Sequence, residues 1–342
     1  MPEEKKVELE RIQREIAANK AELARRGRLG SGSFTVEHFR AWARGIILDT
    51  GKPWEVEDFQ AEFLEDVFRG YEECWLVVPE GNGKTSLTAG LVLYHIDNVP
   101  SAWVPVGAAS RDQAAVLWWQ AYGMVRRSES LQDRFVCQEG NRRIKNMSTG
   151  GRMQIMASDE KTGDGVIPSF AVCDELHRHR DLSLYRTWRG KLKKRRGAQL
   201  VAISTAGEPG SEFESVRARI RDEVKNVTRK GFFTRAESPG IVMHEYAVPL
   251  DVDCTDMRQV KRANPLTAIT EASLKEKFSS PTMTLPHWKR LTCNIATRGI
   301  SAAITDAEWR AMYTAETIPP GEVIWVGIDA AWKWDTFAIM PF

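Results

Sequence analysis

Between residues 74 and 230, short apolar runs alternate with longer segments in which apolar positions recur every three or four residues. The short runs predict strands at 74–79, 102–109, 169–174 and 199–204. The periodic segments predict helices near 84–96, 111–127, 181–194 and 211–226. Strands and helices that alternate in this way build a mostly parallel sheet with helices on both faces. We therefore expect an α/β core whose ligands bind at the carboxyl ends of the strands.

The segments before and within this core follow other patterns. Residues 1–33 are highly charged, have only a thin apolar stripe and end in a Gly-Ser linker, which predicts a helical arm. Residues 34–70 are predicted to be helical around a Gly-Lys-Pro turn, so we place the core domain at 34–230. A hairpin is predicted at 143–157, with its turn at Thr149–Gly151.

The alternation stops after residue 230. Residues 231–318 contain a short strand region at 241–248 and helical patterns near 271–278 and 284–294, which we interpret as a lid or linker subdomain. Residues 319–342 contain one more strand pattern, which ends in a carboxylate at Asp329.

The first strand leads into a glycine-rich turn and a helix, in the sequence Trp75-Leu-Val-Val-Pro-Glu-Gly-Asn-Gly-Lys-Thr-Ser86. Such a turn directs backbone N–H groups toward an anion, and the helix dipole favours negative charge there. Lys84 would reach the β- and γ-phosphates of a nucleotide, and Thr85 would offer its hydroxyl to Mg²⁺. The usual Walker A pattern has glycine five residues before Gly83, where this chain has Val78. A plain turn with a surface lysine is the alternative.

Two adjacent carboxylates follow the strand at 169–174. Asp174 and Glu175 match the form of a second nucleotide motif, the Walker B motif, in which the first holds Mg²⁺ and the second orients the attacking water. The strand at 199–204 ends in the small polar residues Ser204 and Thr205, a place from which a side chain could sense the γ-phosphate. An ordinary acidic turn and an ordinary strand exit are the alternatives for these two segments.

Composition narrows the classes of protein. With 342 residues, 42% hydrophobic and 27% charged, the chain is an ordinary globular one, and its net charge of +2 confines any nucleic-acid site to a local patch. The five cysteines form no CxxC pair, which argues against a zinc site or a disulfide framework. No apolar run approaches membrane-spanning length, and the charged N-terminus is not a signal peptide. We expect a reducing cytoplasm and no membrane.

From about residue 50 onward, the motifs together resemble the large terminase subunit of tailed double-stranded DNA bacteriophages, the ATP-driven motor that packages the viral genome into an empty capsid. The motifs that carry the resemblance are Gly81-Asn-Gly-Lys-Thr85, Gly107-Ala-Ala-Ser-Arg-Asp-Gln-Ala114, Gly163-Asp-Gly-Val-Ile-Pro168, Asp174-Glu-Leu-His177, Ser204-Thr-Ala-Gly207, Arg262-Ala-Asn-Pro265 and Thr292-Cys-Asn294. Their order and spacing are more specific than any one of them.

The resemblance implies a P-loop NTPase-like core that hydrolyses ATP with Mg²⁺. It implies roles for Lys84 and Glu175 in catalysis, for Thr85 and Asp174 at the metal, and for Ser204 and Thr205 in coupling. The nucleotide-binding residues would be Gln60 at the adenine, and Gly81, Asn82, Gly83, Lys84, Thr85 and Ser86 at the phosphates. Arg111 starts a predicted helix near the nucleotide edge, where a phosphate contact and helix packing are both open. The implied partners are double-stranded DNA, further copies in a ring, a portal protein and a small terminase subunit, in the host cytoplasm at the capsid portal.

Cations outside the loop have two candidate roles. The densest basic run includes Arg189, Lys191, Lys193, Lys194, Arg195 and Arg196. It would contact DNA phosphates, act between subunits or form a solvated helix end. A ring ATPase usually borrows a positive charge from its neighbour, and Lys161 is the first candidate, ahead of Arg142 and Arg143. His177 and His179 lack a third spaced ligand, so we interpret them as structural.

The family also contains a nuclease domain with an RNase H-like fold that uses two Mg²⁺ or Mn²⁺ ions. Gly327-Ile-Asp329 resembles its first metal-binding strand, which makes Asp329 a candidate metal ligand. Two-metal chemistry needs carboxylates from several strands, so we expect nuclease activity only in a longer protein. Two other functions remain open at this point: another nucleic-acid translocase such as a helicase, and a non-catalytic nucleotide-gated scaffold.

Overall fold

The computed structural model describes residues 34–156, 167–222, 224, 226–298, 311, 319, 321, 323, 326–329 and 338–341. It forms two units, Met1–Ile300 and Ser301–Phe342, which we describe separately. The predicted helical arm at 1–33 lies outside the described residues.

A ten-stranded sheet forms the centre of the first unit, in the order β3-β4-β5-β2-β6-β7-β1-β10-β9-β8. The bounds in that order are Phe135–Gln138, Arg143–Asn146, Arg152–Met156, Trp103–Gly107, Phe170–Cys173, Gln199–Ser204, Glu73–Val77, Ile241–Tyr246, Phe233–Ser238 and Asn226–Lys230. From β5 to β10 the neighbouring strands are parallel, and antiparallel strands close each edge. This mostly parallel sheet confirms the predicted α/β class.

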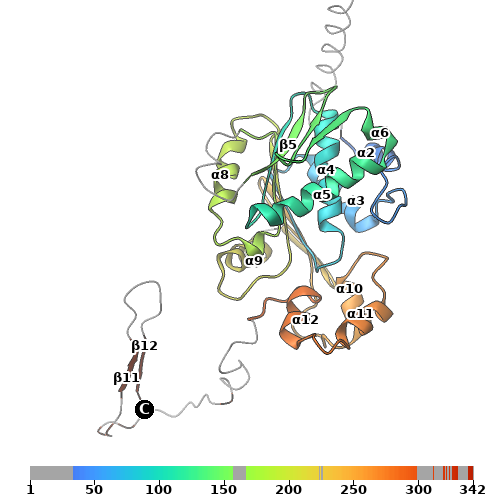
Figure 1. The fold of residues 1–342 in the computed structure, drawn as a ribbon. Coiled ribbons are helices and arrows are strands. Elements are labelled where there is room, and N and C mark those ends of the chain that lie inside the picture. The colour runs from blue at the N-terminus through green and yellow to red at the C-terminus, as the bar shows by residue number, and fades with distance from the viewer. Residues whose placement is uncertain are drawn as a thin grey trace, which may run out of the picture. The chain divides into compact units, whose positions relative to one another are not determined.

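Helices cover both faces of the sheet, as Figure 1 shows. Cys74 and Leu76 of β1 pack in one apolar cluster with residues of α2 (Val36–Ala43), α3 (Asp58–Arg69), α4 (Lys84–Asn98) and α5 (Arg111–Arg127). Trp75 and Val77 pack in a second cluster with residues of α8 (Ser183–Leu192) and α9 (Glu212–Asp222). Because side chains alternate along a strand, a continuous apolar run supplies both faces, which explains why β1 reads as uniformly hydrophobic.

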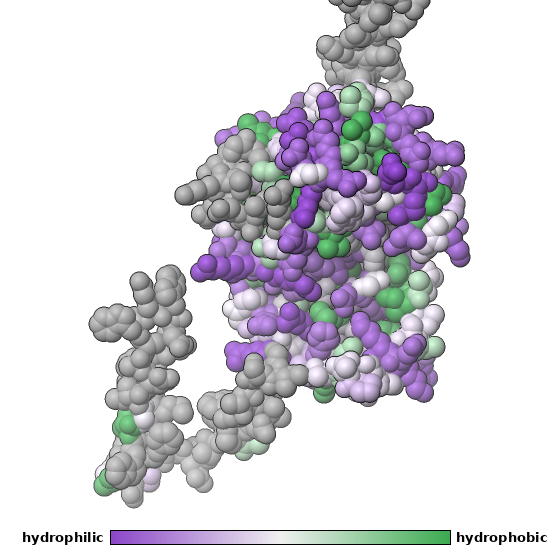
Figure 2. Space-filling model, in the orientation of Figure 1, coloured by the Kyte–Doolittle hydropathy of each residue, from purple (hydrophilic) through white to green (hydrophobic). Residues whose placement is uncertain are grey.

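Short helices complete this unit. They are α6 (Glu129–Gln132), the 3₁₀ turn η2 (Leu176–Arg178), and α10 (Met257–Ala263), α11 (Glu271–Phe278) and α12 (Leu285–Leu291). The last three form a helical subdomain around the buried ring of Trp288. None of the helices in the described ranges is long and apolar enough to cross a lipid bilayer. On the face shown in Figure 2, hydrophilic residues predominate and the apolar patches are small and separate.

The predicted boundary at residue 230 does not match this sheet. Strands β9 and β10 follow it, and β10 pairs in parallel with β1, so the helical subdomain begins only after the sheet ends. The strand region predicted at 241–248 is β10, but its two buried polar residues, His244 and Glu245, gave no sign that the strand lies within the core sheet. His244 hydrogen-bonds Asp66 of α3 at 2.7 Å, and Glu245 pairs with Arg217 of α9 at 2.7 Å, so both are paired within the core.

In the second unit, the described strands β11 (Val326–Asp329) and β12 (Ala338–Pro341) form an antiparallel pair. Asp329 ends β11, opposite Ala338. Its predicted role as a metal ligand stays a prediction.

Candidate nucleotide and phosphate site

The glycine-rich turn connects β1 to the first turn of α4. Gly81 and Gly83 have φ values of 84° and 72°, in the left-handed region that side chains with a Cβ rarely adopt, which is why glycine recurs at this spacing. Gly83 is the N-cap of α4, and Lys84, Thr85 and Ser86 form its first turn. The first N–H groups of a helix have no partners within the helix, so this end of α4 can bind an anion.

Lys84 is buried, with 5% of its surface exposed. Its Nζ donates hydrogen bonds to the carbonyl oxygens of Val78 at 2.9 Å and Pro79 at 3.2 Å, and to Oγ1 of Thr205 at 2.8 Å. Burial lowers the pKa of Lys84, and the nearby carboxylates of Glu175 and Asp174 oppose that shift. An ammonium group has three hydrogens, so Lys84 must exchange at least one of these bonds to contact a phosphate.

Asp174 follows β6 and is 2% exposed. Burial, together with the negative charge of Glu175, raises the pKa of Asp174 to about 7. Its Oδ1 is buried without a hydrogen-bond partner, an arrangement that a bound cation would satisfy. The half-buried Thr85 could supply a hydroxyl to the same ion. A hard oxygen donor set with few protein ligands suits Mg²⁺, which keeps several waters and binds substrate phosphates.

Glu175 has a left-handed backbone, with φ of 46°. Its Oε2 lies 3.1 Å from Nδ1 of His177. Burial alone would raise the pKa of Glu175, but the contact with His177 and the charge of Lys84 outweigh it and lower this pKa. Glu175 is therefore poised as a carboxylate, which is the form that can accept a proton from water.

The two polar residues predicted for coupling lie between the loop and the acidic pair. Ser204 ends β7, which pairs with both β1 and β6. Its Oγ accepts from the backbone N–H of His177 at 2.9 Å, and Thr205 accepts from Lys84. The structure thus brings the three predicted segments together at one edge of the sheet, as parallel neighbours require.

Gln60 lies beside the glycine-rich turn, where an adenine contact was predicted. It is buried in the first turn of α3, and a Cβ added to Gly83 would lie 3.7 Å from its side-chain amide nitrogen. Its Oε1 accepts from the N–H of Glu57 at 3.2 Å, which leaves the amide NH₂ for another acceptor. Glu57 in turn accepts from the N–H of Thr267 at 2.9 Å, so the helical subdomain borders this position.

Three asparagines connect the glycine-rich turn and the ends of neighbouring strands to the helical subdomain. Asn82 donates to Oδ1 of Asn264 at 2.8 Å, and its own Oδ1 accepts from the N–H of Leu266 at 3.2 Å. Asn294 donates to the carbonyls of Val77 and Tyr246 and accepts from the N–H of Ala206 at 2.7 Å. The sequence marked Asn264 and Asn294 only as family landmarks; their contacts across the chain show what they hold together.

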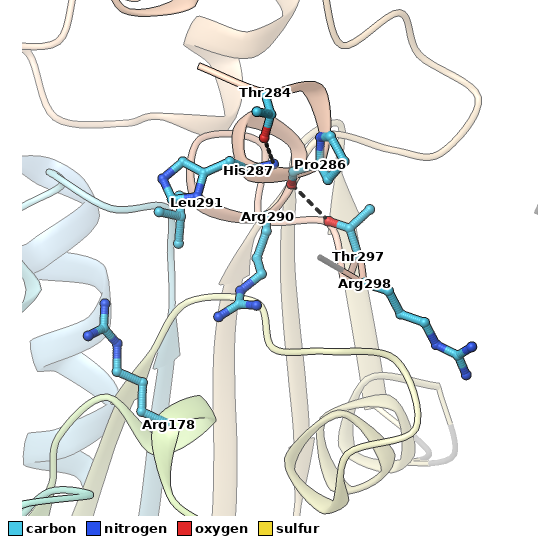
Figure 3. A pocket seen from close by; sticks show the side chains of 8 residues that line it. All are labelled: Arg178, Thr284, Pro286, His287, Arg290, Leu291, Thr297 and Arg298. Atoms are coloured by element: carbon cyan, nitrogen blue, oxygen red, sulfur yellow. Dashed lines mark hydrogen bonds between the residues drawn. The ribbon is translucent and has the colours of Figure 1, made fainter. Parts of the chain in front are cut away.

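A pocket of about 220 Å³ lies between η2 and the region of α12 (Figure 3). Its lining includes three arginines, Arg178, Arg290 and Arg298, and also His287. Arg290 pairs with Glu208 at 3.0 Å, whereas Arg178 makes no side-chain hydrogen bond or ion pair within the described residues. The pocket has a cationic lining, and the sequence patterns gave no sign of it.

The remaining candidates stand apart from this site or lie outside the description. Lys161 is not among the described residues, and of Arg111 only the backbone, at the start of α5, is described. Arg142 pairs with Asp112 at 3.1 Å, and Arg143 donates to Gln154 at 2.9 Å. Their roles stay predictions.

The basic run divides into engaged and exposed side chains. Arg189 pairs with the buried Glu73 at 2.6 Å, and Arg195 donates to the carbonyl of Ser101 at 3.5 Å. Lys193, Lys194 and Arg196 are exposed. Lys191 is half-buried near the end of α8.

A parallel sheet with a glycine-rich turn and buried lysine after β1, and an acidic pair after β6 with only β7 between them, defines the P-loop class of nucleotide-binding α/β folds. Residues 65–222 match the family model described as "Terminase large subunit, ATPase domain". This part of the chain is therefore a terminase large-subunit ATPase domain.

Individual relatives agree with this assignment. The chain is 26% identical over 241 residues to "Terminase, large subunit" of Enterobacteria phage HK97, a match that covers 67% of this chain and 44% of that protein. The chain thus matches less than half the length of this relative. It is similar to the crystal structure of the HK97 large terminase, with a TM-score of 0.64 and 21% identity over 90% of this chain and 67% of that one. It is also similar to the large terminase of a thermophilic bacteriophage in complex with ATP-γ-S, with a TM-score of 0.51 and 12% identity over 81% of this chain and 62% of that one.

Proposed function

We propose that this chain is the ATP-hydrolysing part of a motor that moves viral double-stranded DNA into an empty capsid. The ATPase-domain match and the HK97 relative support the activity, and the ATP-γ-S complex of the thermophilic phage terminase supports nucleotide binding at this fold. The motor would act as a ring at the capsid portal in the host cytoplasm, with a portal protein and a small terminase subunit as partners.

One observation supports hydrolysis most directly: the hydrogen bond between Lys84 and Thr205, which joins the glycine-rich turn to the end of β7 over 121 positions. With Asp174 and Glu175 on the next strand, it gathers a phosphate binder, a metal ligand and a base at one sheet edge. An isolated glycine-rich turn with a surface lysine would not bury the lysine in this way.

Thr85 and Asp174 would hold Mg²⁺, which neutralises charge on the β- and γ-phosphates when it is bound. The N-terminal turn of α4 and Lys84 would bind and orient the phosphates. Glu175 would orient the attacking water and accept its proton at a carboxylate oxygen. Positioning and charge stabilisation supply most of the rate in phosphoryl transfer, so each of these contacts should affect turnover strongly.

Two substitutions test these roles. Lys84→Ala should abolish hydrolysis and weaken ATP binding, because it removes the cation from the phosphate site. Glu175→Gln should retain ATP binding and lose turnover. Phosphate release and binding of a fluorescent ATP analogue measure the two effects, and Lys275→Ala and Glu276→Gln on the exposed face of α11 are matched controls. Wild-type turnover in Glu175→Gln would refute the assignment.

A cation from a neighbouring subunit would complete the site, and Lys161 is the first candidate. Such cations contribute on the order of 10³-fold or more in rate. Lys161→Ala should therefore lose most activity under conditions that favour assembly, and mixing it with Glu175→Gln subunits should restore part of it. Full activity of Lys161→Ala alone, or no restoration on mixing, would exclude Lys161.

The packaging role needs its own assay. The complete protein, with portal-bearing empty capsids, ATP and linear duplex DNA, should protect DNA from added nuclease, and Lys84→Ala protein should not. Strand separation of the duplex without capsids would favour a helicase instead.

A further inference from the structure

A series of polar contacts leads from Lys84 to Glu175 through Thr205 and Ser204, at the end of β7, and through His177 in η2. Lys84 donates to Thr205, Ser204 donates to the backbone carbonyl of Thr205 at 3.0 Å, and Ser204 contacts His177. The ring nitrogen Nδ1 of His177 lies 3.1 Å from Ser204 Oγ and 3.1 Å from Glu175 Oε2. The imidazole thus stands between the coupling strand and the acidic pair.

The contacts of Ser204 indicate which nitrogen of His177 bears the hydrogen. A hydroxyl has one hydrogen, and Ser204 directs it to the carbonyl oxygen of Thr205. Its oxygen already accepts from the backbone N–H of His177 at 2.9 Å. With the Ser204 hydrogen directed to that carbonyl, Nδ1 is the donor in the 3.1 Å contact with Ser204 Oγ. The same nitrogen lies 3.1 Å from Oε2 of Glu175, an oxygen that has no hydrogen-bond partner within the described residues, so this N–H places a partial positive charge beside that carboxylate.

The surroundings of His177 hold its side chain in one orientation. The side chain of His177 is 1% exposed, and its other nitrogen, Nε2, is buried without a hydrogen-bond partner. A Cβ added to Gly207 would lie 3.4 Å from Cβ of His177 and 3.1 Å from the ring of Phe213, so the backbone after the coupling strand packs against this residue. His177 has little room to adopt another orientation.

We propose that His177 is a positioning residue, which sets the Glu175 carboxylate relative to the coupling strand through its Nδ1–H. When Lys84 exchanges Thr205 for a phosphate, the end of β7 loses one of its bonds, and His177 conveys that change to Glu175. The inference rests on the proposed ATPase function and gives His177 a role that the sequence interpretation did not assign to it. It predicts that His177 affects turnover and leaves nucleotide affinity unchanged.

Three substitutions separate positioning from packing. In asparagine the amide nitrogen occupies the place of Nδ1, whereas in glutamine it lies one bond further out, near the place of Nε2. His177→Asn should keep kcat for ATP within about threefold of wild type. His177→Gln and His177→Ala should lower kcat at least tenfold, and all three should keep KM and ADP affinity within about twofold. Equal kcat for the alanine and asparagine variants, or wild-type kcat for alanine, would overturn the proposal.

Two further measurements test the contact between His177 and Ser204. Ser204→Ala removes the opposite end of the contact, and combined with His177→Ala it should lower kcat no more than either change alone; multiplied losses would contradict a shared path. If the histidine variants do not fold, ¹⁵N NMR of the wild-type imidazole decides, since a hydrogen on Nε2 in place of Nδ1 overturns the inference. Absence of ATP hydrolysis in assembled wild-type protein would instead refute the proposed function.

Discussion

Replacing Asp174 with asparagine should stabilise the metal-free protein at alkaline pH. Burial and the charge of Glu175 raise the pKa of Asp174 from 3.8 to about 7. The folded protein therefore binds this proton more tightly than the unfolded chain does. The stabilisation that the neutral carboxyl provides is complete below pH 4 and is lost as the pH rises to about 7. A shift of about three pKa units corresponds to roughly 4 kcal/mol above pH 7.

The assay is urea unfolding of wild type and Asp174→Asn in EDTA without nucleotide, at pH 5 and pH 8. At pH 5 only part of the loss has occurred, so the stability difference between variant and wild type should be greater at pH 8 by roughly 3 kcal/mol. Comparing the two proteins at each pH cancels the titration of all other groups to first order. Asp251→Asn, at an exposed turn, is the control and should show no such change.

The result that refutes this reasoning is a stability difference that is the same at both pH values. It would mean that Asp174 has an ordinary pKa in the folded protein. The buried Oδ1 without a hydrogen-bond partner would then no longer support a cation-binding site at Asp174.

Three other changes test separate parts of the structure. Gly90→Ala should destabilise the protein by about 1–3 kcal/mol in urea unfolding, because the new Cβ would lie 2.1 Å from the ring of Trp54. Gly190→Ala in α8 has open space around it and should stabilise the protein by about 0.5–1 kcal/mol. Equal effects of the two changes would refute the packing argument. Asn294→Ala, which removes bonds to Val77, Tyr246 and Ala206, should cost at least roughly 2 kcal/mol in the same assay, and a cost below about 1 kcal/mol would contradict the bridging role. Replacing both Lys193 and Lys194 with alanine should lower the slope of log affinity for DNA against log salt concentration by roughly two units. The same replacement of Arg258 and Lys275 is the control and should leave this slope unchanged. An unchanged slope for the Lys193 and Lys194 variant would mean that the basic run is only a solvated helix end.

Local signals in the sequence were enough to predict those helices and strands whose pattern of apolar residues is regular. Helix α5 and strand β7 have the predicted starts, because Ser110 caps the helix through its side chain and the apolar run of β7 is unbroken. Strands β8 and β9 were not predicted, and β10 was predicted only as a short strand region outside the core sheet. The polar residues of β10 are buried because partners from distant segments pair with them, as Asp66 does with His244. Such pairing leaves no periodic pattern along the strand.

The candidate site, like the fold, could be predicted from the sequence only in part. The three loops follow predicted strands, so their meeting at one sheet edge could be inferred from the parallel topology. His177 was interpreted as structural because the sequence shows no third spaced ligand. Its contact with Ser204 joins residues 27 positions apart and depends on the order of the strands, so no local pattern reveals it. Asn264 likewise reveals its part only through Asn82, 182 positions earlier.

The bonds of Asn82 and Asn294 bear on where the protein can be divided. The stretch that matches the family model ends at residue 222, but β10, Asn264 and Asn294 come later in the chain. A protein cut at that point would leave β1 without one neighbour and the amide of Asn82 without its main partner. The smallest piece that can hold the glycine-rich turn in its observed shape therefore extends past Asn294. In shorter pieces the turn would lack these contacts, so nucleotide binding measured on them would not represent the turn of this structure.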